Sequence, residues 1–325
     1  MEITVIIPVR DRAQLLPRTL ESIAALTRRP DRLIIVDNGS TDDTPVKARE
    51  FMTAHPEMRI DIISEPEPGA ARARNAALRL VGTEPDSYVM HFDSDDIMLP
   101  QHIERVVKAL ENRPDTDLLY FDVTMRDSDG WTQPKTCDGD APLMRNHIFH
   151  CVLSTTRYAA SADLLRRAGW WNESLPRWND YELGLRIALA AEHPMKLTGE
   201  PMVVILTHDD SITGTSYSAD APVLIEALDT MRRALAKAGR KQDLRYLHAR
   251  RAIVAALFAR EGDRDNSRTL LADALRAVPT VKDALKLRLI YTTVRLLGRG
   301  GGTLGAMLLA PPKPRHATRL RKERE

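Results

Sequence analysis

Several features that mark large protein classes are scarce or absent in this 325-residue sequence. Its two cysteines, Cys137 and Cys151, have neither the CxxC spacing of a metal or redox site nor the number needed for a disulfide framework. No stretch reaches the roughly eighteen consecutive apolar residues typical of a membrane-spanning helix. No predicted strand is followed by GxGxxG, and GxxxxGK[ST] is missing. We therefore expect a reducing, cytoplasmic setting and exclude nicotinamide dehydrogenases and P-loop NTPases.

Charge is nearly balanced overall but unevenly distributed. The formal net charge is +2, yet residues 276–325 hold twelve Lys and Arg against three acidic residues, so the preceding part is close to −7. Two parts of opposite sign suggest two tasks. We expect no nucleic-acid partner.

Short apolar, β-branched runs alternate with helical periodicity through the first two hundred residues. Strands are predicted at residues 3–9, 32–36, 59–64, 88–92, 118–125, 152–160 and 202–206, and helices at 13–26, 70–81, 101–112, 162–167 and 181–191. The opening strand, followed at once by charge, is unlike a signal peptide. Alternating strands and helices predict an α/β fold with a mostly parallel sheet, in which ligands bind at the carboxyl ends of the strands.

The segment YVMHFDSDDIMLP, residues 88–100, places three carboxylates at such a strand end. Asp93, Asp95 and Asp96 repel one another unless a cation or donor groups are supplied. Mg²⁺ or Mn²⁺, which favours one or two carboxylates plus phosphate oxygens and water, suits this arrangement. The alternative is that these residues only cap the next helix, and we assign that role to Asp96.

Two later segments are candidates for substrate contacts. Residues 131–150 are polar and contain two prolines, which predicts a loop. Residues 169–178 crowd three of the four tryptophans into one stretch. Clustered aromatics are either part of the core or a surface on which a sugar stacks.

Beyond residue 218 the sequence changes to Ala, Leu and Arg in helical periods. In the last helix, residues 280–297, Val281, Leu285, Leu289, Ile290, Val294 and Leu297 are predicted to line one apolar face beside basic residues. Such a helix either lies on an anionic membrane surface or packs on its own domain. We expect three parts: a catalytic domain at 1–218, a helical extension at 219–299 and a flexible basic tail at 300–325.

The chain resembles the family-two glycosyltransferases, which have the GT-A fold, over roughly residues 2–215. The resemblance rests on five segments in order: VIIPVRDRAQLLPRTLESI, IIVDNGSTDDT, GAARARNAAL, FDSDDIMLP and ESLPRWNDYELGLRIA, followed by THDDSITG. It implies a Rossmann-like, mostly parallel sheet flanked by helices, here with an α-helical C-terminal extension.

The resemblance also implies which residues hold the nucleotide: Pro8, Arg10, Asp37, Asn38, Arg74, Asn75 and Asp93. Asp37 would accept the N3–H of uracil, which favours a uridine nucleotide. The sequence departs from the family pattern at Asn38, where a second Asp is usual, and at Arg10 and Asp11, which replace Tyr-Asn.

By the same resemblance, Asp93, Asp95 and His208 would bind the metal, and Trp178 and Asn179 would contact the acceptor. Asp180 would be the general base that removes the proton of the acceptor hydroxyl. The family usually has Glu-Asp where this chain has Asn179-Asp180, so the base is kept and its acidic neighbour is lost.

The sequence thus predicts a metal-dependent inverting glycosyltransferase. Its donor would be a nucleoside-diphosphate sugar, with UDP favoured, and its acceptor a saccharide or lipid-linked hydroxyl in bacterial cell-surface polysaccharide synthesis. We expect a cytoplasmic enzyme, peripheral on the cytoplasmic face of the membrane through residues 280–325. The alternative is a non-catalytic scaffold on a decayed transferase fold that binds nucleotide or docks on a membrane, which Asn38 and Asn179 would favour.

Overall fold

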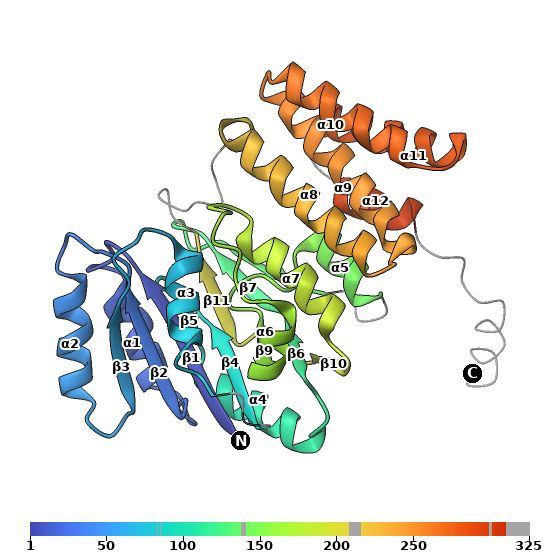
Figure 1. Cartoon of the computed structure of the whole chain (residues 1–325). Helices are drawn as coiled ribbons and strands as arrows, with labels where there is room; N and C mark the ends of the chain where they lie inside the picture. Colours follow the sequence, from blue (N-terminus) through green and yellow to red (C-terminus); the bar gives the residue numbers. More distant parts are fainter. Residues whose placement is uncertain (83, 85, 138–140, 208–215, 299–300, 310–325) are drawn as a thin grey trace. The chain divides into compact units, whose positions relative to one another are not determined.

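The computed structural model describes residues 1–82, 84, 86–137, 141–207, 216–298 and 301–309 (Figure 1). The chain forms two compact units, the first from Met1 to Arg240 and the second beginning at Lys241. The predicted boundary near residue 218 differs from this division by one helix, α8 (Ala221–Lys237), which packs against α7 (Asn179–Ala190) within the first unit.

Seven strands form the main sheet, in the order β10-β6-β9-β4-β1-β2-β3. Its parallel centre consists of β1 (Glu2–Val9), β2 (Arg32–Asp37), β3 (Ile60–Ser64) and β4 (Ser87–His91). On the other side of β4 lie β9 (Tyr158–Ser161), antiparallel to both neighbours, then β6 (Leu118–Phe121) and β10 (Pro194–Leu197). The mostly parallel α/β sheet predicted from the sequence is confirmed.

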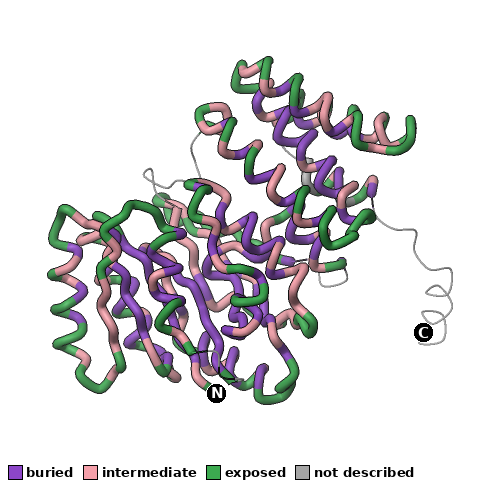
Figure 2. Tube along the Cα trace, in the orientation of Figure 1, coloured by how far each residue is buried: buried purple, intermediate pink, exposed green. Residues whose placement is uncertain are grey.

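Helices cover both faces of this sheet, as the continuous apolar strands require. Ile3, Val5 and Ile7 of β1 point to the face covered by α1 (Leu16–Ala24), α2 (Thr44–Ala54) and α4 (His102–Asn112). Ile6 points to the opposite face, covered by α3 (Ala70–Leu78), α6 (Ala162–Ala168) and α7. The inner strands β1, β2, β4, β6 and β9 are buried along most of their length, whereas the edge strands β3 and β10 are only partly buried (Figure 2).

A second, four-stranded sheet has the order β5-β11-β7-β8. It contains β5 (Ile97–Met98), β11 (Val203–Leu206), β7 (Val123–Arg126) and β8 (Thr132–Lys135). The single strand predicted at residues 118–125 is therefore wrong, because β6 and β7 belong to different sheets. The break falls at Asp122, whose carboxylate accepts from the backbone N–H of Cys137 and pairs with Lys196 at 3.0 Å.

Two other predictions in this region are corrected. Residues 131–150 are not only loop, because they contain β8 and the helix α5 (Leu143–His150). The strand predicted at residues 152–160 is shorter, since β9 begins only at Tyr158. Cys151 and Thr156 adopt left-handed φ angles of 50° and 66°, which an extended strand does not accommodate.

The second unit is helical, as expected. It contains α9 (Lys241–Arg260), α10 (Arg264–Ala277), α11 (Val281–Leu297) and α12 (Gly301–Leu308). Among the helices that the structure describes, none is both long enough and apolar enough to cross a membrane. The tail beyond residue 309 lies outside the described residues.

The single apolar face predicted for the last long helix is wrong. Ile290 and Val294 are buried together with Leu287, whereas Val281, Leu285, Leu289 and Leu297 are exposed. The predicted set mixed residues from two faces because both faces of this helix carry apolar residues at a spacing of three or four.

His102, at the start of α4, makes stability depend on pH. It is buried beside Phe121, with ring centroids 4.7 Å apart, and neither ring nitrogen has a hydrogen-bond partner among the described residues. Burial, with a smaller contribution from Arg105, lowers the pKa of His102 to about 3. The unfolded chain binds a proton near the usual pKa of about 6.5, so the free energy of unfolding falls as pH falls from there toward 3.

We predict that His102→Leu lessens this loss by about 2 kcal/mol between pH 8 and pH 5. Urea unfolding followed by tryptophan fluorescence measures it in the first unit, where all four tryptophans lie. His193→Leu, at an exposed site, is the matched control. Equal pH dependence in the wild type and His102→Leu would contradict the prediction.

Candidate active site

The predicted site residues gather at the carboxyl ends of the parallel strands. From β1 the chain proceeds to β2 and then β3 on one side of the sheet, and it then returns to place β4 on the other side of β1. The order in which the strands are connected therefore reverses between β1 and β4. Such a switch point leaves a crevice where ligands of α/β sheets bind. Asp93 follows β4 there, Arg10 follows β1, and Asp37 ends β2, beside Val9 in register.

The loops after β1 and β2 are tied together. The backbone N–H of Asp11 donates to the Ser40 hydroxyl, and the Asp11 carboxylate accepts from the backbone and hydroxyl of Thr41. These bonds lower the pKa of Asp11 and hold it at a left-handed φ of 48°. Pro8 is buried in β1 opposite Val36, while the Arg10 side chain is 48% exposed beside this loop. The position of Asp11 thus orders the loop that presents Arg10.

Asp37 and Asn38 connect β2 to the turn before α3. The Asp37 carboxylate accepts from the backbone N–H of Ser40 at 3.2 Å. The buried amide of Asn38 donates to the carbonyls of Glu65 and Glu67 and accepts from the backbone N–H of Gly69. Gly69 has a φ of 141°, which L side chains rarely adopt. Asn38 therefore shapes the turn that starts α3, and its predicted contact with a nucleotide stays a prediction.

Arg74, on α3, is the cation at the centre of the site. Its side chain is 7% exposed, and its guanidinium donates to the Asp93 carboxylate at 2.7 Å. The Arg74 Cζ lies 4.3 Å from the centre of the Trp171 ring, within cation–π range. The Trp171 indole N–H in turn donates to the Nε2 of the buried His91 at 3.2 Å. The sequence did not single out Trp171, although the crowding of tryptophans at residues 169–178 was the available signal.

Asn75 fixes the loop that carries Trp171. Its amide accepts from the backbone N–H of Trp171 and donates to the Trp171 carbonyl and to Glu173. Glu173 also pairs with Arg72 at 3.5 Å. Trp171 belongs to the core, as one interpretation of the tryptophan cluster predicts, whereas Trp170 and Trp178 are partly exposed and their stacking on a sugar stays a prediction.

Two carboxylates around Arg74 have raised pKa values. Loss of water raises the pKa of Asp93; Arg74 opposes this, and the charges of Asp95 and Asp180 add to it. Burial likewise raises the pKa of Asp180, although the hydrogen bond from the Tyr181 N–H and the positive charge of Arg74 act to lower it. The structure thus brings Asp180, distant in sequence, into the electrostatic neighbourhood of Asp93 and Asp95.

The role predicted for Asp96, capping the next helix, is wrong. The residue before α4 is Gln101, which makes no side-chain capping bond. Asp96 is instead buried and accepts from the backbone N–H of Leu206 at 3.1 Å. Burial, then the charges of Asp93 and Asp95, raises its pKa well above the ordinary value. Asp96 therefore joins the carboxylate segment to β11.

The first turn of α7 carries Asp180, and several contacts hold it. Asn179 donates to the Leu175 carbonyl, and the buried His147 lies 2.8 Å from the Tyr181 carbonyl. Gly184 permits this packing, since an added Cβ would lie 2.3 Å from His147 Cε1. Trp178 precedes the helix at a left-handed φ of 58° and packs edge-on against Tyr181.

The donor set suits a hard divalent cation. Asp93 and Asp95 supply carboxylate oxygens at a strand end, and the carboxylates near Arg74 outnumber its single positive charge. His208 lies outside the described residues. Within the residues described, no three His, Cys, Asp or Glu side chains come together as a complete metal cage. Mg²⁺ and Mn²⁺ need no such cage when phosphate oxygens and water complete the shell.

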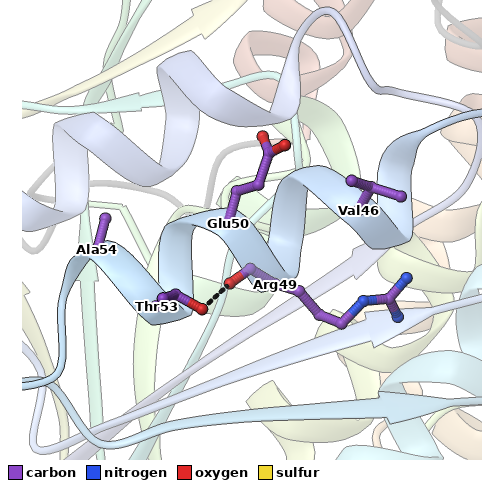
Figure 3. A pocket seen from close by; sticks show the side chains of 5 residues that line it. All are labelled: Val46, Arg49, Glu50, Thr53 and Ala54. Atoms are coloured by element: carbon purple, nitrogen blue, oxygen red, sulfur yellow. Dashed lines mark hydrogen bonds between the residues drawn. The ribbon is translucent and has the colours of Figure 1, made fainter.

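An open hollow of about 450 Å³ lies elsewhere, on the surface of α2 (Figure 3). Its lining residues, Val46, Arg49, Glu50, Thr53 and Ala54, all come from that helix. None is a predicted site residue, so this hollow is not part of the site.

Residues 4–159 match the family described as glycosyl transferase family 2. The chain is 29% identical over 202 residues to YwdF of Bacillus subtilis, described as an uncharacterized glycosyltransferase, covering 58% of this chain and 68% of that protein. It is 23% identical over 238 residues to an uncharacterized glycosyltransferase of Haemophilus influenzae, covering 71% and 76%.

Solved structures share the fold. That of S. aureus TarS 1-349 in complex with UDP-GlcNAc matches with a TM-score of 0.70 at 19% identity, covering 95% of this chain and 90% of TarS 1-349. The mannosyltransferase PcManGT from Pyrobaculum calidifontis, in complex with GDP-Man and Mn²⁺, matches with a TM-score of 0.53 at 20% identity, covering 95% and 85%. With its mostly parallel sheet and helical C-terminus, and with these relatives, the chain is a glycosyltransferase with a fold similar to GT-A, and its residues 4–159 match glycosyl transferase family 2.

Proposed function

We propose that this enzyme transfers a sugar from a nucleoside-diphosphate sugar to an acceptor hydroxyl with inversion at the anomeric carbon. The observation that carries the proposal is the arrangement of Asp93, Asp95 and Asp180 around Arg74 at the switch point. In this arrangement Asp93 and Asp95 can bind a cation, and Arg74 can bind an anion. Asp180 is a separate carboxylate that can accept a proton.

The donor is proposed to be a UDP-sugar. Asp37, at the end of β2, keeps lone pairs beyond the one used by Ser40 and can accept the N3–H of uracil. Pro8 and Arg10 flank the same crevice from β1, and the Nε of Arg74 is buried with no hydrogen-bond partner among the described residues. TarS binds UDP-GlcNAc on this fold and PcManGT binds GDP-Man, so the base is the point to test.

The metal is proposed to be Mn²⁺ or Mg²⁺, held by Asp93 and Asp95 with His208 as a further ligand. When bound, it would neutralise the charge of the diphosphate leaving group. Arg74 orients Asp93 for this task, and its own positive charge favours the diphosphate in the same crevice.

Asp180 is proposed as the general base. Its carboxylate takes the proton of the acceptor hydroxyl as that oxygen bonds to the anomeric carbon, while the bond from this carbon to the diphosphate oxygen breaks. Burial raises the pKa of Asp180, which makes it a stronger base than an ordinary carboxylate. Trp178 and Asn179, beside it in the chain, are proposed to contact the acceptor.

The acceptor is proposed to be a saccharide or lipid-linked saccharide, used in bacterial cell-surface polysaccharide synthesis. We place the enzyme in the cytoplasm, peripheral on the cytoplasmic face of the membrane. The low cysteine content and the excess of nine positive charges at residues 276–325 support that setting.

Replacing the proposed base tests the chemistry. Asp180→Asn should lower kcat by about 10²- to 10⁴-fold and leave nucleotide affinity unchanged, because only proton removal is lost. Steady-state transfer assays and calorimetric nucleotide titration measure the two effects. Asp265→Asn, the same change at an exposed site on α10, is the control. Retention of more than about a tenth of the activity would remove Asp180 from this role.

Replacing a proposed metal ligand tests the donor site. UDP, GDP and dTDP, each titrated with and without Mn²⁺, should show metal-dependent binding of one diphosphate, and we expect UDP. Asp95→Ala should abolish that binding, since it removes a cation ligand. Glu111→Ala, at an exposed position on α4, should bind as the wild type does. If the wild type binds none of the three diphosphates, the proposed donor site is refuted.

The support of Arg74 by Trp171 is tested by a pair of variants. Trp171→Leu removes the ring face and should weaken UDP binding about tenfold, the order of a desolvated cation–π contact. Trp171→Phe keeps a ring face and should recover most of that loss. Trp170→Leu is the neighbouring control. Equal affinity in the Leu and Phe variants would mean that Trp171 acts only as core.

A further inference from the structure

Helix α11 exposes an unusual number of large apolar side chains. Val281 is 78% exposed, Leu285 61%, Leu289 51% and Leu296 72%. Together with Leu297, these make five exposed large hydrophobic side chains on this one helix. The whole first unit also has five among its described residues. Single exposed apolar residues are ordinary, but a group on one helix indicates a partner.

These side chains form a stripe. At about 100° per residue, Val281, Leu285, Leu289 and Leu296 fall within an arc of roughly 80°. The buried residues Leu287, Ile290 and Val294 lie on the opposite side of the helix, which packs against α9. The helix is therefore held to its own unit by one apolar face and presents a second one outward.

Basic side chains border the stripe on both edges. By the same geometry, Lys282 and Lys286 lie along one edge, and Arg288 and Arg295 along the other. Asp283, the acidic residue of this helix, is in the first turn, where its backbone N–H donates to the capping Thr280 hydroxyl.

The helix is well fixed at both ends. Thr280 caps the start, and Arg260 of α9 donates to the Arg295 carbonyl near the end. With seventeen residues, the helix is about 25 Å long. The stripe is thus preorganised and needs no folding on binding.

We propose that this stripe, Val281, Leu285, Leu289 and Leu296 with its four bordering cations, docks on the surface of an anionic lipid bilayer. The apolar side chains enter the boundary between headgroups and acyl chains while the Lys and Arg side chains reach the anionic headgroups. A second copy of the same face is disfavoured, because it would set cations against cations. The sequence of residues 310–325, with six Lys and Arg against two Glu, adds charge of the same sign.

This inference rests on the membrane location proposed above and not on the transfer reaction, so the two can fail separately. Vesicle binding needs no turnover, and nucleotide titration of the same preparation tests the donor site independently.

The test is co-sedimentation of the full chain with vesicles of phosphatidylcholine alone or with about 30% phosphatidylglycerol, a charge content suited to polybasic segments. The wild type should bind the anionic vesicles and release at high salt, as screened charges do. Leu285→Glu with Leu289→Glu should weaken binding by about tenfold or more, since two apolar anchors become anions. Lys282→Glu with Lys286→Glu should do the same by removing the charge attraction.

The matched control is Val46→Glu with Leu80→Glu, two exposed apolar sites on the first unit, which should bind vesicles as the wild type does. Circular dichroism of each variant checks that the helices remain. The proposal is overturned if the wild type does not prefer anionic vesicles, or if the Leu285 and Leu289 variant binds them unchanged. It is also overturned if analytical ultracentrifugation shows a dimer that this variant abolishes while vesicle binding stays intact.

Discussion

The ion pair between Arg74 and Asp93 is the interaction on which the site depends. A guanidinium buried to this degree needs a partner, and Asp93 gains a neutralising charge beside Asp95 and Asp180. Because Arg74 lies on α3 and Asp93 at the end of β4, one bond joins a helix to the strand end that carries the carboxylates. Trp171 below the guanidinium and Asn75 beside it bring in a third element, the loop at residues 169–178. The same contacts therefore determine both the electrostatics and the packing of the site.

The parallel sheet explains why these groups meet at all. Its apolar strands need helices on both faces, and the crossovers bring the strand ends of β1, β2 and β4 to one edge. Polar turns at that edge are then bound to one another, as Asp11 is to Thr41 and Asn38 to Gly69. The site is ordered before any ligand arrives because the polar groups of its loops form hydrogen bonds with one another.

Much of the fold was predictable from periodicity, since buried β-branched runs and amphipathic helices leave local patterns. The errors fall where the decisive contacts are distant in sequence. Asp96 follows the rule for a helix cap, but its partner is Leu206, more than a hundred residues away. The split at Asp122 depends on Cys137 and Lys196. On α11, two apolar faces overlap in sequence, and only packing shows which is covered. Motif order pointed to Asp93 and Asp95, but the support given by Trp171 has no local signal beyond an aromatic-rich loop.

The segment between β6 and β9 leaves and re-enters the main sheet at adjoining positions. Leu118, Leu119 and Tyr120 pair with Ala160, Ala159 and Tyr158, and the backbone N–H of Phe121 donates to the Arg157 carbonyl. Everything from Asp122 to Arg157, including β7, β8 and α5, is thus an excursion whose two ends are hydrogen-bonded neighbours. Its length and composition can change without shifting the register of the large sheet. A lineage, or a protein engineer, can vary the parts of this piece that do not contact α7 or β11 while the strands that carry the carboxylates stay in place.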